Sequence, residues 1–449
     1  MFLCIGGKMF YLNSQLELTD ALLGKMINHF HQQVEPKLTK YKNYYDGMQA
    51  ILNKTYSDPS KPCNKSVINY CKNIVDSYVG YLATPGYISY TSPEDNIETI
   101  IDVLKYNDYQ AQDADFLLDA LIYGVAAELM YTDTLGQVRF RLINPTQCFG
   151  IYDDSLTGDL LYFVRIYKAS EWDDSNTYNV DVYSDYQIKH YQMEGINGQL
   201  QLITEEFHYF SQCPANIFYL PDEKSIFDCI LSLQDSVNEI VSAEIDDYSA
   251  FCDAYLVLEG VDATKEEMAA MKEARALVMP EGAKAYWLTK NATDAQVENI
   301  LKRLHDSIYR ISACVDFSSE QFAGGVSSGV AIKYKMTGME TRAGKIEAEM
   351  KKALQRRIEI LCGIASLKLG EEMFRDIQID FKRNIPEDIT ATINLINSLK
   401  GSVSDKTLLG QLEFVEDVEA ELEAVQEQKA QNMSLYSFGT ENFYESGQE

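Results

Sequence analysis

The sequence predicts an α+β protein of several domains, mainly helical, with an antiparallel β meander and two long helices that flank a small α/β insert. Three observations favour this fold. Apolar residues recur at helical spacing before residue 131 and again after residue 225. Between residues 137 and 210 they alternate or form short runs separated by turn residues, as in antiparallel sheets. Two amphipathic segments, 225–255 and 294–313, then enclose a short stretch of mixed character.

The composition excludes several classes of protein. The chain has 449 residues, 46% of them apolar and 24% charged. It is therefore long enough for roughly two to four folded domains and too apolar to be disordered throughout. Asp and Glu number 68 against 39 Lys and Arg, a formal charge of −29. This balance argues against a protein whose whole surface binds nucleic acid or anionic lipid, but it is compatible with basic residues gathered in one place.

Cysteine, histidine and hydropathy patterns exclude further classes. The nine cysteines form no Cys-x-x-Cys pair and the five histidines form no His-Glu-x-x-His. Neither a disulfide framework nor a zinc site is therefore predicted. The longest apolar run, 116–130, is interrupted by Asp119 and Glu128 and is too short to span a bilayer. We expect a protein without cofactor, metal, signal peptide or membrane segment, made in a reducing cytoplasm.

The N-terminal part is predicted to be helical. Several stretches have helical spacing, namely 16–53, 67–82 and two within 97–131. A loop rich in Pro and Ser at 57–64 separates the first two, and Thr84-Pro85-Gly86 stops the second. The meander of 137–210 follows these helices.

The next part is predicted to be a helical hairpin. Its first helix, 225–255, would be about 45 Å long at 1.5 Å per residue. The insert, 256–288, has strand-like ends around a short helix at 264–276. The second helix, 294–313, carries its apolar residues on one face, namely Val297, Ile300, Leu301, Leu304, Ile308 and Ile311.

A third long helix is predicted to begin near Ser328, a suitable N-cap, and to reach about Leu369. Kinks are expected in it because it contains Gly338, Gly344 and Gly363. One strand, 377–381, precedes an acidic helical stretch at 387–429, and the last twenty residues are expected to be disordered.

One motif points to catalysis. Gly325-Val326-Ser327-Ser328-Gly329 fits the Gly-x-Ser-x-Gly elbow, in which Ser327 would be the nucleophile of a serine hydrolase. That fold needs a strand before the serine and a histidine after it, whereas a polar loop precedes Ser327 and the last histidine is His305. A glycine hinge that caps the next helix is the favoured interpretation. Because Walker and dinucleotide-binding glycine motifs are also missing, the sequence does not support an enzyme.

Basic residues are concentrated in one region. Residues 299–357 hold eleven basic and six acidic residues, a net +5, whereas 385–449 hold three basic and thirteen acidic residues, a net −10. On a helical wheel Lys302, Arg303 and Arg310 lie opposite the apolar face of the helix 294–313. Two interpretations are open: an ordinary solvated face, or a face that contacts a polyanion.

Five stretches carry a resemblance to a known family. The most specific begins with Gly325-Val326-Ser327-Ser328-Gly329 and extends to Met336. The others are 64–82 with Pro85, 121–128 with 138–145 and 164–167, 227–260, and 403–409 with 415–423. Together, in order along residues 40–425, they resemble the portal (head–tail connector) proteins of tailed bacteriophages, of the siphophage type from Gram-positive hosts. Cys63 and Thr84 depart from the residues usual in that family, and neither departure bears on function.

The resemblance implies a portal-protein fold with named regions. They are the wing (1–224, helices plus meander), a first stem helix (225–255), the clip (256–292), a second stem helix (293–315), the tunnel loop (316–327), a long kinked helix with a wing strand (328–384), the crown (385–430) and a disordered tail (431–449).

The resemblance also implies a function. Members form a homo-oligomeric ring, a dodecamer, at one capsid vertex of the virion. The ring is a passive conduit for double-stranded DNA during packaging and ejection. It binds DNA without sequence specificity, and it docks the terminase, the major capsid or scaffolding protein and a head-completion adaptor. The alternatives are another ring-forming virion adaptor, or a serine hydrolase that uses Ser327.

The same resemblance assigns site residues. The tunnel loop would contact DNA through Phe322, Gly324, Gly325, Val326, Ser327 and Ser328. Lys302, Arg303 and Arg310 would line the inner face of the stem. A mostly acidic wall with sparse cations suits DNA that must slide, because each neutralised phosphate adds affinity through counterion release.

Overall fold

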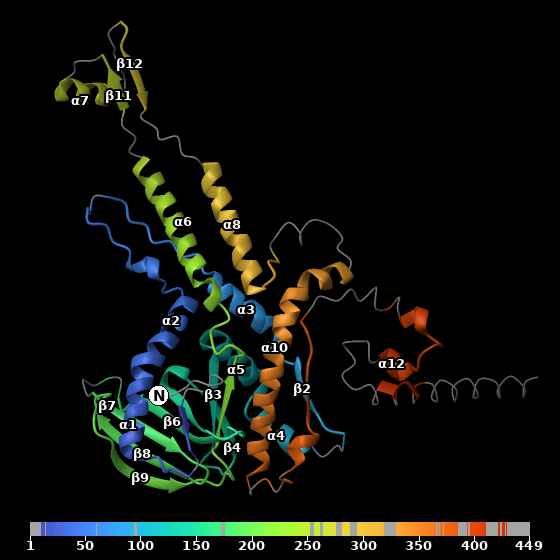
Figure 1. The fold of residues 1–449 in the computed structure, drawn as a ribbon. Helices are drawn as coiled ribbons and strands as arrows, with labels where there is room; N and C mark the ends of the chain where they lie inside the picture. The colour runs from blue at the N-terminus through green and yellow to red at the C-terminus, as the bar shows by residue number, and fades with distance from the viewer. Residues whose placement is uncertain are drawn as a thin grey trace, which may run out of the picture. The chain divides into compact units, whose positions relative to one another are not determined.

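The structure is a computed structural model that describes residues 10–428 with gaps (Figure 1). The gaps are 14, 60, 94–96, 171, 173–175, 252–255, 261–263, 275–280, 288–293, 318–328, 365–366, 368, 371, 385–392, 394–395, 410–420, 423 and 427. Two compact units are present. The first comprises 1–324 and 335–384, and the second comprises 325–334 and 385–449.

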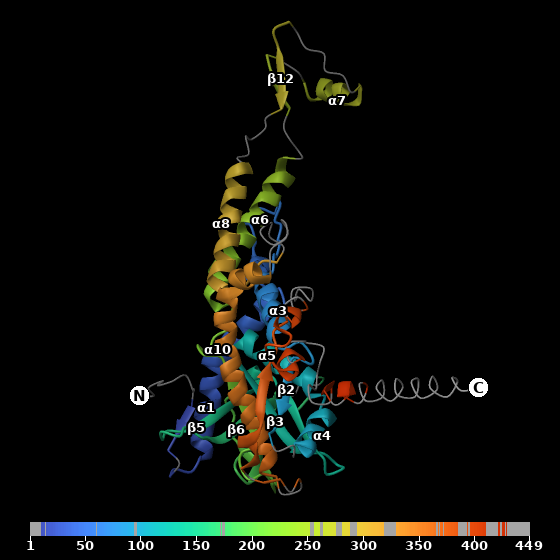
Figure 2. The ribbon, with the colours of Figure 1, turned by 90° about the vertical axis from the view of Figure 1, so that its right-hand side faces the viewer.

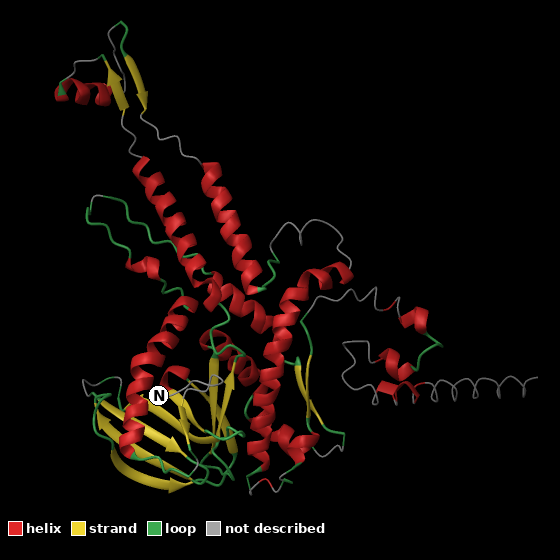
Figure 3. Cartoon of the chain, viewed as in Figure 1, coloured by secondary structure: helices red, strands yellow, loops and turns green. Residues whose placement is uncertain are grey.

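Two sheets form the base of the first unit (Figure 3). The larger has the order β1-β5-β6-β7-β8-β9, and the smaller has the order β10-β3-β4. The strands of the larger sheet are β1 Phe10–Leu12, β5 Cys148–Asp153, β6 Leu160–Lys168, β7 Thr177–Tyr183, β8 Gln187–Glu194 and β9 Gln201–Phe207. Consecutive strands from β5 to β9 pair antiparallel, which confirms the meander, whereas β1 adds a parallel strand that the sequence did not predict.

The smaller sheet begins earlier than predicted. It contains β3 Val125–Thr132, β4 Val138–Ile143 and β10 Ala215–Tyr219, so the expectation of helix through residue 131 was wrong. Helix α5 (Tyr109–Tyr123) stops at Gly124, whose φ is +83°. A side chain at Gly124 would meet the backbone of Lys224 at 2.7 Å, so glycine alone allows this turn.

The first predicted helix is divided. Thr19 caps α1 (Asp20–His29) by accepting the Leu22 N–H, and a π-helical stretch, Phe30–Val34, leads into α2 (Glu35–Tyr45). After Tyr45, the only helical part of the predicted stretch 16–53 is a short 3₁₀ turn at Ala50–Asn53. The first unit also contains helix α4 (Glu98–Tyr106) and a two-stranded sheet in which β2 (Ile88–Thr91) pairs antiparallel with β13 (Gln378–Phe381). Strand β13 confirms the strand predicted at 377–381.

The helix predicted at 67–82 begins at Tyr70, as α3 (Tyr70–Leu82). Residues 64–69 are extended instead, because their backbone is hydrogen-bonded to another helix, α6 (Leu231–Phe251). Four polar side chains of α6, one per turn, accept the N–H groups of alternate residues in the extended segment. The pairs are Gln234 with Tyr70 (3.0 Å), Asn238 with Ile68 (2.9 Å), Ser242 with Ser66 (3.0 Å) and Asp246 with Asn64 (2.6 Å).

We call these four pairs the polar seam. Its regularity follows from two matching lengths: four helical residues rise about 6 Å, and two extended residues advance about 6.6 Å. Gln234, Asn238 and Ser242 have no exposed surface and Asp246 is 8% exposed. Burial disfavours the Asp246 carboxylate, but hydrogen bonds from Asn64 and Tyr56 outweigh it and hold the Asp246 pKa below its ordinary value.

Helix α6 is shorter than the predicted 225–255. Ser225 Oγ and the Ile226 N–H both donate to the carbonyl of Leu121, which fixes this stretch on α5, and a 3₁₀ turn at Asp228–Ile230 precedes the helix. Its 21 residues span about 32 Å. Helix α8 (Asp294–Ser312) matches the predicted 294–313, and it lies beside α6 in both views (Figures 1 and 2).

Between α6 and α8 in the chain, β11 (Leu256–Glu259) and β12 (Lys284–Trp287) pair antiparallel and α7 (Lys265–Ala274) connects them, which confirms strand-like ends around a short helix. Helix α10 (Gly329–Cys362) runs unbroken through Gly338 and Gly344. It ends at Cys362 rather than at the predicted Leu369, and a side chain at Gly363 would collide with Ser211. In the second unit, Asp405–Leu409 forms α12.

Breaking the polar seam should destabilise the protein. Asn238→Ala removes the acceptor of the Ile68 N–H and the donor to Gln49 Oε1 (2.5 Å) in a fully buried place. We expect a loss of about 1–3 kcal/mol in the free energy of unfolding, measured by urea denaturation. The exposed Asn53→Ala should change it by less than about 0.5 kcal/mol. If the two substitutions changed the free energy of unfolding equally, the polar seam would not be a source of stability.

Candidate functional site

The predicted site residues fall in two places. Phe322, Gly324, Gly325, Val326, Ser327 and Ser328 lie outside the described residues, so their assignment stays a prediction. Lys302, Arg303 and Arg310 are on α8 and all three are exposed. The candidate site that can be described is therefore the helix pair α6 and α8 with the elements that hold it.

One side of α8 is fixed to the body of the first unit. Ile308 and Ser312 are fully buried. The ring of Tyr70 lies 5.8 Å from that of His305 and 6.0 Å from that of Tyr309, and Asn73 donates to the Tyr309 hydroxyl at 2.8 Å. Helix α8 therefore has a defined rotation about its own axis.

The C-terminal end of α8 is tied down by an arginine of α10. Arg342 donates to the carbonyl of Ser312 and to that of Ile226, each at 2.8 Å. A guanidinium suits a helix C-terminus, where carbonyls lack partners within the helix and the helix dipole is negative. The same contact places the end of α8 beside the segment that leads into α6, so the two helices run antiparallel.

The other side of α8 is open. Ile300 is 40% exposed and Ile311 is 48% exposed, so only part of the apolar face predicted from the sequence is buried within the chain. Arg303 and Arg310 adjoin Ile300 on this open side, since residues three, seven and ten positions after Ile300 share a face of a helix. The expectation that both arginines lie opposite the apolar residues was therefore wrong for Ile300 and Ile311. Lys302 is exposed on the adjoining side, toward Asp306 and Tyr309.

The basic region 299–357 is not one surface. Arg357 has no exposed surface, and Arg356 donates to Gln212 and Glu359. Lys351 and Lys352 pair with Glu347 and Glu349 on their own helix. The net +5 therefore overstates what a polyanion could contact, because a sum along the sequence ignores which charges are buried or paired.

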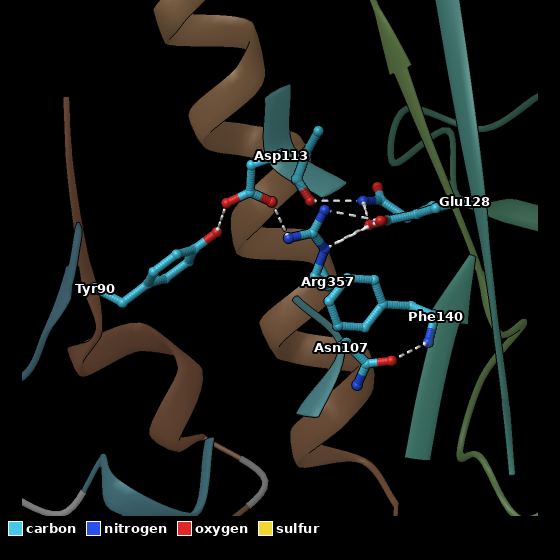
Figure 4. Close-up of polar contacts among 8 residues, drawn as sticks. Tyr90, Asn107, Asp113, Glu128, Phe140 and Arg357 are labelled. Atoms are coloured by element: carbon cyan, nitrogen blue, oxygen red, sulfur yellow. Dashed lines mark hydrogen bonds and ion pairs between the residues drawn. The ribbon is translucent and has the colours of Figure 1, made fainter. Parts of the chain in front are cut away.

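Arg357 is the centre of a buried ion cluster (Figure 4). Its guanidinium, on α10, pairs with Asp113 of α5 and makes two bonds of 2.8 Å to Glu128 of β3. Tyr90 of β2 donates to Asp113 at 2.8 Å, and Asn216 of β10 donates to Glu128 at 2.6 Å. The cluster thus joins α10 to four other elements, and each buried charge has a partner of opposite sign.

The pKa values in the cluster follow from this pairing. Burial works against the charged form of Arg357, but Asp113 and Glu128 outweigh it, so the Arg357 pKa lies above its ordinary value. Burial, followed by the charge of Asp113, raises the Tyr90 pKa well above the ordinary value of a tyrosine. Arg357 is therefore a permanent cation and Tyr90 a permanent hydroxyl donor, a structural arrangement rather than an acid–base pair.

Neither the polar seam nor the ion cluster was found from the sequence. Gln234, Asn238, Ser242 and Asp246 recur every fourth residue, and this spacing was the available signal for the seam. In the part of the chain that the structure describes, no three His, Cys, Asp or Glu side chains are placed to hold a metal ion. Within the same residues, no helix has the length and apolar character to cross a membrane.

Comparison with known proteins gives one consistent result. Residues 23–435 match the family model described as phage portal protein, SPP1 Gp6-like. The portal protein of Bacillus phage SPP1 is 21% identical over 420 residues, 87% of this chain and 80% of the relative. The portal protein of Clostridium phage phiCD119 is 22% identical over 443 residues, 91% of this chain and 96% of the relative.

Removing the centre of the ion cluster should be costly. Arg357→Leu leaves Asp113 and Glu128 buried without a cation, and we expect a loss of about 3–5 kcal/mol in unfolding free energy by chemical denaturation. Neutralising both acids as well, in Arg357→Leu/Asp113→Asn/Glu128→Gln, should recover part of that loss. Arg375→Leu, on an exposed ion pair, is the matched control and should change little. A single variant as stable as this control would refute the cluster's role.

Proposed function

Because the chain belongs to the SPP1 Gp6-like family of phage portal proteins, we propose that its copies close into a ring through which double-stranded DNA passes during packaging and ejection. The protein is a bacteriophage portal protein, a virion component that serves in DNA packaging. In this proposal the ring is a dodecamer at one capsid vertex. It docks terminase, the major capsid or scaffolding protein and a head-completion adaptor, and the chain is made in the cytoplasm of the bacterial host.

The observation that carries the ring is the half-covered pair α6 and α8. One side of α8 is packed on its own chain, while Ile300 and Ile311 on the other side are exposed. Apolar side chains on a long exposed helix gain free energy when a neighbour covers them, at about 25 cal/mol per Å² buried. In a closed ring of identical copies each helix pair covers the next, so no copy is left with an open face.

The named regions of the portal fold are assigned as part of this proposal. The wing is 1–224, the stem helices are within 225–255 and 293–315, the clip is 256–292, and the tunnel loop is 316–327. Residues 328–384 form the long helix and wing strand, 385–430 the crown and 431–449 the tail. The order α6, then the β11–α7–β12 insert, then α8 supports the stem–clip–stem part.

We assign the DNA-facing role on the stem first to Lys302, which is exposed and lies away from Ile300 and Ile311. The tunnel-loop residues predicted from the sequence, 322 and 324–328, remain candidates for the same role. A chain of net charge −29 repels DNA over most of its surface, so a few cations suffice to centre the duplex. Few neutralised phosphates also mean weak binding, which sliding requires.

The conduit is proposed to be passive. The sequence has no phosphate-binding glycine motif, so the energy for packaging would come from a separate terminase. For the hydrolase alternative, Ser327 has no histidine after it in the chain. No observation favours the adaptor, since both relatives are portal proteins.

Charge reversal at Lys302 should test the DNA-facing role. In a phage that lacks its own portal gene product, Lys302→Glu supplied in trans should lower the DNA packaged per particle several-fold, because a ring of added negative charge repels the duplex. Rings of the purified variant should be unchanged. Lys61→Glu, the same change on an exposed loop, is the matched control. Normal packaging by the Lys302 variant would remove this residue from the tunnel.

A further inference from the structure

We propose which faces of the two long helices meet between neighbouring copies: the open face of α8 packs on the open face of α6 of the next copy. The inference rests on the proposed ring and names its contact. The α8 face consists of Ile300, Arg303, Ser307, Arg310 and Ile311. The α6 face consists of Ser232, Ser236, Glu239, Ala243 and Asp247.

The α8 face is defined by spacing and exposure. Counted from Ile300, its members follow at steps that stay on one side of an α-helix. Ile300 and Ile311 are 40% and 48% exposed, and Arg303 and Arg310 are exposed between them. Apolar residues interleaved with arginines are typical of surfaces that bind protein, since arginine is enriched at interfaces.

The α6 face is the side of α6 on which the side chains are exposed. One side of α6 is occupied by the polar seam. Helix α6 also contacts α8, and we assign that contact to the side that holds the buried Val237. The residues of the α6 face are all exposed. Three of them, Ser232, Ser236 and Ala243, are small, so a second helix can approach closely and an isoleucine can enter the groove between turns.

The two faces are complementary in charge. The α8 face carries Arg303 and Arg310, and the α6 face carries Glu239 and Asp247. The Glu239 side chain is 60% exposed and makes one ion pair, with Lys54 at 3.2 Å. A carboxylate accepts several hydrogen bonds, so Glu239 can hold a guanidinium from the next copy as well.

The heights of the two faces also agree. The Tyr70 N–H is bonded to Gln234 of α6, and the Tyr70 ring contacts His305 and Tyr309 of α8. These contacts put Gln234 level with the last turns of α8. Since the helices are antiparallel, a residue further toward the C-terminus of α6 is level with a residue further toward the N-terminus of α8. Glu239 of α6 is therefore level with Arg303 of α8. A rotation about an axis along the helices keeps these heights, so Arg303 of one copy meets Glu239 of the partner subunit, and Ser307 meets Ser236 of the partner subunit.

Disulfide trapping tests this contact directly. In a Cys229→Ser background, which removes an exposed thiol, Ser236→Cys/Ser307→Cys should give a ladder of covalent multimers on non-reducing gels after mild oxidation. Ser236→Cys/Lys302→Cys, with the second cysteine on the adjoining side of α8, is the matched control and should stay monomeric. Ser236→Cys alone and Ser307→Cys alone, each in the Cys229→Ser background, should also give only the monomer band.

Charge reversal gives a second readout. Arg303→Glu should lower the fraction of protein in rings at least several-fold by native mass spectrometry, whereas Lys302→Glu, the same change on the adjoining side, should leave it unchanged. If the unmodified protein forms no rings, the proposed function fails. If rings form but the control pair cross-links in place of Ser236 with Ser307, or Arg303→Glu assembles normally, the ring stands and this assignment of faces is overturned.

Discussion

The constraint on which the rest of the structure depends is that the buried face of α6 is polar. Gln234, Asn238 and Ser242 have no exposed surface, and a buried polar group without a partner costs several kcal/mol of folding free energy. Each is satisfied by a backbone N–H of the extended segment 64–70. The segment must therefore stay extended at this register, and α6 must keep this rotation. The faces that α6 and α8 offer to a neighbour follow from it.

The polar seam and the ion cluster of Arg357 solve the same problem at two places. Apolar contacts are tolerant of small slips, because burial free energy depends on area and not on direction. Hydrogen bonds and ion pairs are directional, and a slip leaves a buried group unpaired. The seam fixes α6 along its length, and the cluster fixes α10 against α5, β2, β3 and β10. A subunit that must fit identical neighbours on both sides has use for such fixed positions.

Much of the secondary structure could be predicted from the sequence, and most of the tertiary contacts could not. The meander, α8 and β13 follow from the periodicity of neighbouring residues, and they are where they were expected. The helix starts at Tyr70 and Leu231 were misplaced because partners more than 100 residues away hold the preceding residues out of the helix. Arg357 was counted in the net charge of residues 299–357, since a sum along the sequence cannot tell a buried cation with distant acids from a solvated one. The family itself was identified from five short stretches, because their order along the chain carries information that no single motif has.

Copies of this chain are proposed above all to surround a passage for DNA. Electron microscopy of the purified full-length protein tests this claim most directly. We predict toroids of uniform size, with side views in which α6 and α8 form a collar around a hole wide enough for a duplex. Particles that remain single chains at every protein concentration, and in extracts of infected cells, would contradict the claim.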